Sequence, residues 1–203
     1  MYFFTFCNFI NRISQRNLED ALFMLLSSME KCLPEYNLLC FINYELDFKR
    51  FEKFNIEFRN YYDDGSLSVY RSDPDGTTWK NMSFNKLNIF KDIYNETGKD
   101  YIWVDLDTII AFDISYINEL TNIFIPNGGT CENNNKIFSN TGNNYVIPRK
   151  NNLQGNFWKI NIDIYNDLMD TFKEIKEKGY ILQYDAQSLF NYHIYFKNKM
   201  CIN

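Results

Sequence analysis

The first segments of the chain place the strongest constraint on its fold. Residues 2–10 form a near-continuous apolar run, which is typical of a strand buried on both faces of a parallel sheet. Segment 18–33 has leucines at helical spacing, and Pro34 would end that helix. A second apolar run at 36–43 predicts another strand. This strand–helix–strand order predicts an α/β layer architecture with a right-handed crossover.

The rest of the chain continues the alternation of strands and helices. Bulky apolar residues at helical spacing predict a helix at 79–97 that ends near Gly98, because glycine suits the left-handed conformation of a helix C-cap. The other elements expected, in chain order, are a strand at 54–58, a loop at 60–78, a strand at 101–104, Asn- and Gly-rich loops at 127–135 and 139–144, a helix at 160–178 and a helix beginning near Asp185. We expect one α/β domain over residues 1–203, with a mixed, mostly parallel central sheet flanked by helices.

Charge and cysteine content argue against several classes of protein. The chain carries 21 Lys and Arg residues against 26 Asp and Glu residues, whereas nucleic-acid-binding proteins usually present a basic stripe. An acidic protein that binds a diphosphate must neutralise it locally, through a cation or a few placed basic residues. Five cysteines without a Cys-x-x-Cys pair, and a single histidine, argue against a zinc site or a disulfide framework and favour a reducing compartment such as the cytoplasm. No apolar run approaches the length of a membrane span.

Two carboxylates follow the strand expected at 101–104. In open α/β sheets, ligands bind outside the carboxyl ends of the strands, where Asp105 and Asp107 would lie. Residues two apart in an extended segment point the same way, so we expect the two carboxylates side by side. Two such charges about 4 Å apart repel by roughly 4 kcal/mol at an effective dielectric constant of about 20. A proton, a basic group or a divalent metal would have to offset this repulsion.

Three interpretations of this Asp-x-Asp segment compete. In the first, one Asp caps a following turn and the other is solvated. The second is a phosphatase of the haloacid dehalogenase type, but the Gly of that nucleophile motif is missing and the segment lies far from the start of the chain. The third is a resemblance. The apolar strand, the acidic pair, the continuation Thr108–Phe112 and the strand–helix–strand opening resemble glycosyltransferases of the GT-A fold, whose metal-binding motif is Asp-x-Asp.

The resemblance implies roles for particular residues. A hard cation, Mn²⁺ or Mg²⁺, would be held by Asp105 and Asp107 and would bridge the phosphates of the donor. His193 is the candidate third metal ligand, since some retaining members use a C-terminal histidine. Asp185 and Gln187, at the start of a helix, are the candidate catalytic residues facing the anomeric carbon. The residues implied in donor binding are Thr5, Phe6, Arg12, Arg59, Trp79, Lys86, Asp105 and Leu106.

Several of these residues also have a purely structural interpretation. Lys86 could be a solvated helix residue and Trp79 a core aromatic. Asp185 is a good helix N-cap by its residue type alone, and His193 could be a packed or surface histidine. At this point both interpretations stay open for each of them.

The function implied is metal-dependent transfer of a hexose or deoxyhexose from a UDP-sugar donor to a glycan or glycoprotein acceptor, with retention of configuration. The nucleotide-binding half would be about 1–110 and the acceptor-binding half about 111–203, and the domain could belong to a longer chain. Size and composition resemble the small glycosyltransferase domain of large algal viruses, which glycosylates the capsid protein, so host cytoplasm would be the location. The alternatives are a catalytically silent nucleotide- or glycan-binding module and the phosphatase.

Overall fold

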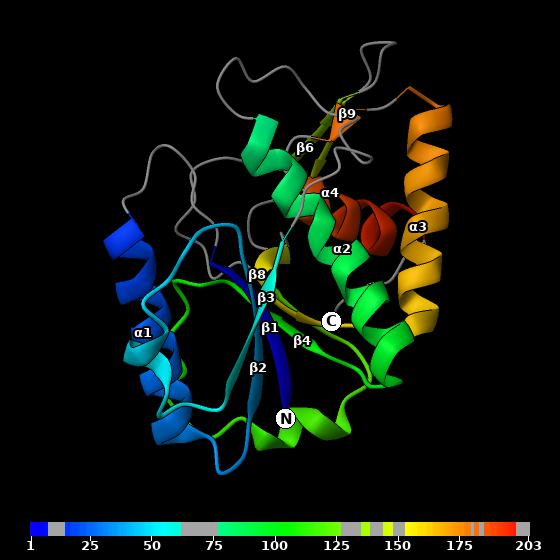
Figure 1. Cartoon of the computed structure of the whole chain (residues 1–203). Coiled ribbons are helices and arrows are strands. Elements are labelled where there is room, and N and C mark those ends of the chain that lie inside the picture. The colour runs from blue at the N-terminus through cyan, green and yellow to red at the C-terminus, as the bar shows by residue number, and fades with distance from the viewer. Residues whose placement is uncertain are drawn as a thin grey trace.

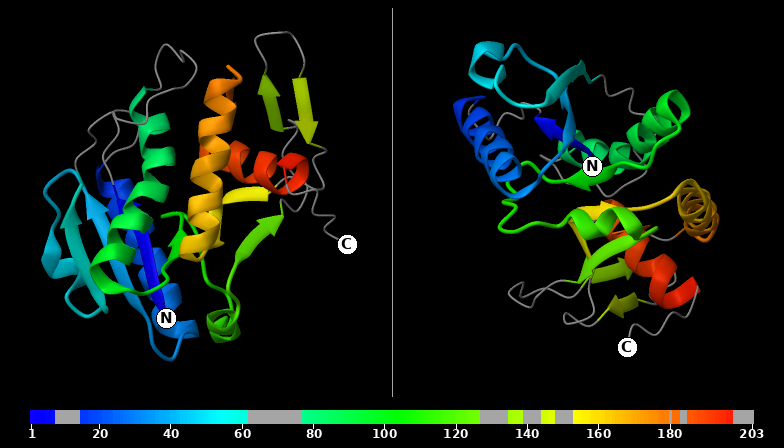
Figure 2. Two further views of the ribbon diagram at one scale, coloured as in Figure 1. Left: turned by 90° about the vertical axis from the view of Figure 1, so that its right-hand side faces the viewer. Right: turned by 90° about the horizontal axis from the view of Figure 1, so that it is seen from below.

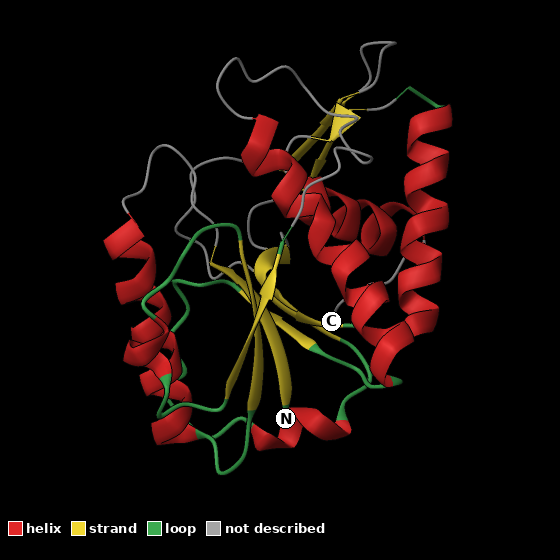
Figure 3. Cartoon of the chain, viewed as in Figure 1, coloured by secondary structure: helices red, strands yellow, loops and turns green. Residues whose placement is uncertain are grey.

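The structure is a computed structural model. It describes residues 1–7, 15–61, 77–126, 135–138, 144–147, 153–179, 181–182 and 185–197. Within these residues the helices and strands follow one another along the chain in a mixed α/β arrangement (Figures 1 and 3). Their bounds are β1 Tyr2–Cys7, α1 Gln15–Cys32, β2 Asn37–Ile42, β3 Ile56–Asn60, α2 Thr77–Thr97, β4 Ile102–Val104, β5 Ile123–Pro126, β6 Asn135–Phe138, β7 Asn144–Ile147, β8 Leu153–Lys159, α3 Ile162–Glu177, β9 Ile181–Leu182 and α4 Asp185–Tyr192. Short 3₁₀ turns lie at Phe48–Phe51 and Ser115–Glu119, and a π-helical turn at His193–Lys197 follows α4.

A six-stranded mixed sheet with the order β3-β2-β1-β4-β8-β5 forms the centre of the molecule. The first four strands in this order are parallel, and β8 runs antiparallel between β4 and β5. The chain places β2 and β3 on one side of β1 and then returns to add β4 on the other side. The direction of strand addition therefore reverses between β1 and β4. A smaller sheet has the order β7-β6-β9.

Helices cover both faces of the six-stranded sheet. Helix α1 lies on one face, and α2, α3 and α4 lie on the other, as the views in Figures 1 and 2 agree. Side chains of β1 alternate between the two cores: Phe3 and Cys7 pack with α1, while Phe4 and Phe6 pack with α2. This period of two is expected for a strand buried on both faces, and it explains why the first apolar run of the sequence shows no polar alternation.

Local features of the sequence determine where helix α2 ends and where helix α3 begins. Helix α2 stops at Thr97 because Gly98, at φ 66°, takes the left-handed conformation and donates its N–H to Tyr94 O at 2.8 Å. Helix α3 begins after Asn161, whose side-chain oxygen accepts the N–H of Ile164 at 2.9 Å. The expected start at residue 160 is therefore two residues early.

The expected elements are confirmed with small shifts in their bounds. The strand expected at 54–58 begins two residues later, because Phe54 donates its N–H to Phe51 O at 3.0 Å and closes a turn before β3. The helix expected at 79–97 begins two residues earlier, at Thr77. The first strand is seen as Tyr2–Cys7, and the end of the expected run lies outside the described residues. Most of the loops expected at 60–78, 127–135 and 139–144 also lie outside them.

The described helices include none that is both long and apolar enough to cross a membrane. This agrees with the absence of a long apolar run in the sequence.

Replacement of Phe90 tests the core between α2 and the sheet. The Phe90 side chain is fully buried, and its ring lies 6.2 Å from that of Trp158 and 5.9 Å from that of Tyr165, measured between centroids. We expect Phe90→Ala to lower the free energy of unfolding by about 3–5 kcal/mol, because the substitution leaves a cavity. Urea denaturation followed by circular dichroism measures this change. The control is Phe112→Ala, whose side chain is 65% exposed and should change stability by no more than about 0.5 kcal/mol. Equal effects would contradict this description of the core.

Candidate functional site

In open α/β sheets a ligand-binding crevice is expected where the strand order reverses, which in this fold is at the carboxyl ends of β1 and β4. Loops that leave two neighbouring strands in opposite directions separate there, and the separation opens a space above the sheet. In this sheet the reversal lies between β1 and β4. Asp105 follows β4 directly, so its side chain stands at this point.

Backbone geometry after β4 differs from the sequence expectation. Asp105 O accepts the N–H of Thr108 at 3.0 Å, which makes Asp105–Thr108 a turn. The premise that residues 105–107 are extended is wrong, because these residues form a turn. The position of the two carboxylates relative to each other stays a prediction. Leu106 packs partly against the core on the α1 face, and Asp107 is exposed.

The carboxylate of Asp105 is held by a lysine and a tryptophan. Lys86 Nζ lies 2.9 Å from Asp105 Oδ1, and Trp103 Nε1 donates to the same oxygen at 2.8 Å. Lys86 Nζ also stands 4.2 Å from the centroid of the Trp103 ring and 3.5 Å from Gly155 O. The Asp105 N–H donates to Asn156 O at 2.7 Å. A basic group therefore offsets the charge of Asp105, which is one of the three solutions expected from the sequence.

Helix α4 brings Gln187 to the same place through β8. A Cβ atom built on Gly155 would lie 3.5 Å from Gln187 Cβ, so the helix passes close to the strand at this glycine. Asn191 holds the two elements together. Its Oδ1 accepts the Leu153 N–H at 2.9 Å, and its Nδ2 donates to Leu153 O at 3.1 Å and to Gln187 O at 2.7 Å. Lys86, Asp105 and Gln187, three residues singled out in the sequence, thus converge around Gly155.

The sequence reasoning missed residues that complete this arrangement. The contact of Trp103 with Asp105 could have been predicted from the sequence. Trp103 lies two residues before Asp105 at the end of a buried strand, close enough for its indole to reach the carboxylate. No sequence pattern predicts the roles of Gly155, Asn156 and Asn191, because β8 and α4 meet the other elements only in the tertiary structure. Among the described residues, the buried Oδ1 of Asn156 has no hydrogen-bond partner.

Two residues of β1 lie behind the crevice. Thr5 is fully buried, and its hydroxyl has no hydrogen-bond partner within the part of the chain that the structure describes. The ring of Phe6 packs at 5.0 Å, between centroids, from both Trp103 and Tyr61. Phe6 therefore supports the Trp103 ring, and neither side chain reaches the surface of the crevice.

Arg59 forms ion pairs with two glutamates that lie away from Asp105. Its guanidinium pairs with Glu57 at 2.7 Å and with Glu96 at 2.7 and 3.1 Å. The hydrogen bonds to Glu96 have the largest effect on the pKa of Arg59, and together with Glu57 they raise it. Glu96 lies ten residues beyond Lys86 on α2 (96 − 86), which is about 15 Å along a helix. The structure therefore does not bring Arg59 to the Lys86–Asp105 pair.

Three other expected site residues cannot be placed by their side chains. Arg12 lies outside the described residues. Trp79 belongs to the first turns of α2, and Asp185 begins α4. For both residues the structure describes the backbone but not the side chain. Their roles stay predictions.

His193 packs against α3 and is almost fully buried. Its Nδ1 lies 2.8 Å from Thr171 Oγ1, and that hydroxyl donates its single proton to Asp167 O at 2.8 Å. His193 Nδ1 must then carry the proton and donate to Thr171, since a hydroxyl has only one to give. The described residues contain no group of three or more His, Cys, Asp or Glu side chains that could hold a metal ion. The structure thus does not bring His193 together with Asp105 and Asp107.

Comparison with known proteins adds no family to these observations, since no family model and no curated protein matches the chain.

The burial of His193 predicts a pH dependence of stability. Burial, the largest effect, lowers the pKa of His193 below the ordinary histidine value of 6.5. Between the two pKa values the unfolded chain binds a proton and the folded chain does not, so the free energy of unfolding falls as pH drops below about 6.5. Urea midpoints at about pH 7.5 and about pH 5.5 measure this fall. His193→Asn, which has no titrating group at this position, should lose less stability over the same interval.

Equal losses in the two proteins would contradict this description of His193. The same variant also tests the metal prediction. A metal ligand at this position would make Mn²⁺ raise the urea midpoint of the wild type but not that of His193→Asn.

Proposed function

We propose that this chain is a glycosyltransferase of the GT-A type that transfers a sugar from a UDP-sugar to a glycan or glycoprotein acceptor. The observation that carries the proposal is the convergence of Lys86, Asp105 and Gln187 at the carboxyl end of β4. The three residues come from α2, the β4 end and α4, and the resemblance had assigned donor-contacting or catalytic roles to each of them.

The position of Lys86 supports binding of a diphosphate. Its side chain is 13% exposed, yet its Nζ stands beside the crevice and pairs with Asp105, which is 32% exposed. A buried ion pair adds little net stability, since desolvation offsets much of the attraction. A charged pair held in a crevice is therefore better explained by ligand binding than by folding. Lys86 would provide positive charge where an acidic protein has to accept phosphates.

A divalent cation fits the remaining carboxylates. Mg²⁺ is usually bound through one or two carboxylates together with substrate phosphates, so it needs no third protein ligand. Asp107 is exposed and lies two residues after Asp105; it would hold such an ion, with Asp105 as the second ligand. When bound, Mn²⁺ or Mg²⁺ would supply electrostatic stabilisation of the departing diphosphate.

The chain's own residues would position the donor and protect the reacting centre. Trp103 donates its indole N–H to Asp105 and so fixes that carboxylate toward Lys86. Gly155 lies against α4, since a Cβ atom at this position would be 3.5 Å from Gln187 Cβ, and this contact places the start of α4 beside β8. Gln187 would present its amide oxygen to one face of the anomeric carbon, with Asp185 at the start of the same helix. Stabilisation of an oxocarbenium-like centre on that face would give retention.

Binding of UDP is the first test of the proposed function. We expect calorimetric titration to detect UDP binding in Mn²⁺, no binding in EDTA, and weaker binding of GDP. Asp107→Ala should abolish metal-dependent binding and lower transfer by about 10²–10³-fold, since it removes an electrostatic contribution to the transition state. The matched control is Asp170→Ala, an exposed aspartate on α3, which should leave UDP binding unchanged.

Each rival function predicts a different result. No binding of UDP or GDP in the presence of metal would overturn the transferase proposal. UDP binding without turnover of any UDP-sugar would indicate a catalytically silent module. Release of inorganic phosphate from a phosphomonoester, dependent on Asp105, would indicate the phosphatase.

A further inference from the structure

Two neighbouring pockets open on the side of α2 that faces the edge strand β3. The first has a volume of about 250 Å³, and its apolar floor includes Phe41 and Ile89. The second, of about 570 Å³, lies at the carboxyl end of β2. Asn60 and Tyr61 line both pockets, so the two adjoin each other, and we call them together the β3-edge groove.

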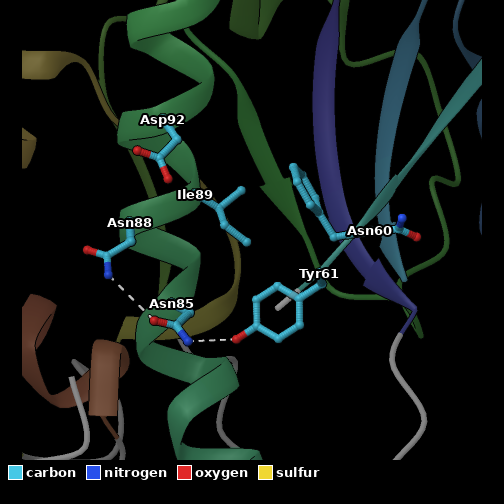
Figure 4. A pocket seen from close by; sticks show the side chains of 7 residues that line it. Asn60, Tyr61, Asn85, Asn88, Ile89 and Asp92 are labelled. Atoms are coloured by element: carbon cyan, nitrogen blue, oxygen red, sulfur yellow. Dashed lines mark hydrogen bonds between the residues drawn. The ribbon is translucent and has the colours of Figure 1, made fainter. Parts of the chain in front are cut away.

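A chain of side-chain amides lies along one wall of this groove. Asn88 Nδ2 donates to Asn85 Oδ1 at 3.5 Å, and Asn85 Nδ2 donates to Tyr61 Oη at 2.6 Å (Figure 4). Asn85 is 7% exposed, so these bonds hold its amide in a single orientation. Asn88 lies one turn further along α2 and is less deeply buried, with its carbonyl oxygen free of hydrogen bonds from the described residues. The wall therefore presents oriented donors and acceptors rather than mobile surface amides.

Among the described residues that line the groove, the charged ones are acidic. Asp92 stands one helical turn beyond Asn88, and Glu45 lines the second pocket. Burial raises the pKa of Asp92, and its carboxylate receives no hydrogen bond from the residues that the structure describes. Neither pocket has a lysine or arginine among its described lining residues. A phosphate would therefore be repelled, whereas a neutral hydroxyl group could donate its proton to either carboxylate.

We propose that the β3-edge groove binds a neutral saccharide, one pyranose unit in the first pocket and a second unit toward Glu45. Hydroxyls surround a pyranose ring and both donate and accept, which matches amides and carboxylates placed on different sides of the groove. The apolar face of the ring would pack on the aromatic residues Phe41 and Tyr61. Phe48, which is 50% exposed in the second pocket, offers a further ring for the second unit.

The groove is separate from the Lys86–Asp105 site. Phe6 stands between them, since its ring contacts Tyr61 in the groove on one side and Trp103 in the site on the other. Saccharide binding in the groove does not require the chain to be a transferase, so this proposal stands independently of the proposed function. In a transferase, the groove would retain a glycan outside the reacting centre.

Saturation-transfer NMR tests the groove with defined probes: the methyl glycosides of glucose, galactose and mannose, and the disaccharides maltose and lactose. For a ligand of this size we expect a dissociation constant of about 1–10 mM. Asp92→Ala should weaken binding by about tenfold, since it removes a charged acceptor, and Asn88→Ala by about threefold to tenfold.

The control variants are Asn95→Ala, an exposed asparagine on the same helix, and Asp170→Ala on α3, both of which should bind as the wild type does. Asp92→Asn, which keeps an acceptor of the same shape, guards against loss through misfolding and should retain more binding than Asp92→Ala.

Three outcomes would overturn the proposal. One is the absence of saturation transfer from every probe at about 50 mM, well above the expected dissociation constant. Another is displacement of the glycoside by UDP, which would assign the groove to the nucleotide site. The third is preferential binding of spermidine with steep salt dependence, which would indicate a cationic ligand. Because UDP titration and glycoside titration are separate measurements, failure of one proposal is distinguishable from failure of the other.

Discussion

The parallel pairing of β1 with β4 is the interaction on which the rest of the structure depends. Phe3 and Phe4 pair with Ile102 and Trp103, which places β4 on the opposite side of β1 from β2. Because a right-handed crossover puts each connecting helix on the face set by its direction, α1 and α2 must cover opposite faces. The strand order then reverses at the carboxyl ends of β1 and β4, and Asp105 follows β4 directly at this point.

Within that crevice, the Lys86–Asp105 pair resolves an electrostatic problem posed by the sequence. Two carboxylates separated by one residue need compensation. The turn at Asp105–Thr108 breaks the extended geometry, and Asp107 is exposed to solvent. Lys86 Nζ offsets the charge of Asp105 at 2.9 Å from its Oδ1. The pair is oriented further by the indole of Trp103, whose ring is itself packed against Phe6 in the core. Core packing on the α2 face thus determines where the charged groups of the site point.

Two other buried ionisable residues, Lys159 and His193, have structural partners, and this contrast helps to identify functional ones. Lys159 donates to the carbonyl oxygens of Ile117, Asn118 and Leu120 and so anchors the segment before β5. Burial lowers the pKa of this lysine, as expected for a charge withdrawn from water. His193 is satisfied in a similar way by Thr171. The Lys86–Asp105 pair and the β3-edge groove differ, because the Asp105 side chain is partly exposed and the polar groups of the groove line pockets.

The sequence by itself determined the order of the elements and the place of the acidic segment. The apolar period, Pro34 and Gly98 are local signals, and the backbone responds to them within a few residues, so the bounds of the expected helices and strands were predictable to about three residues. Only the tertiary structure decided which side chains meet. The Asp105 turn, the approach of α4 to Gly155 and the separation of Arg59 and His193 from the crevice depend on contacts between segments far apart in the chain. Such contacts depend on packing over the whole molecule, and a local sequence pattern does not predict them.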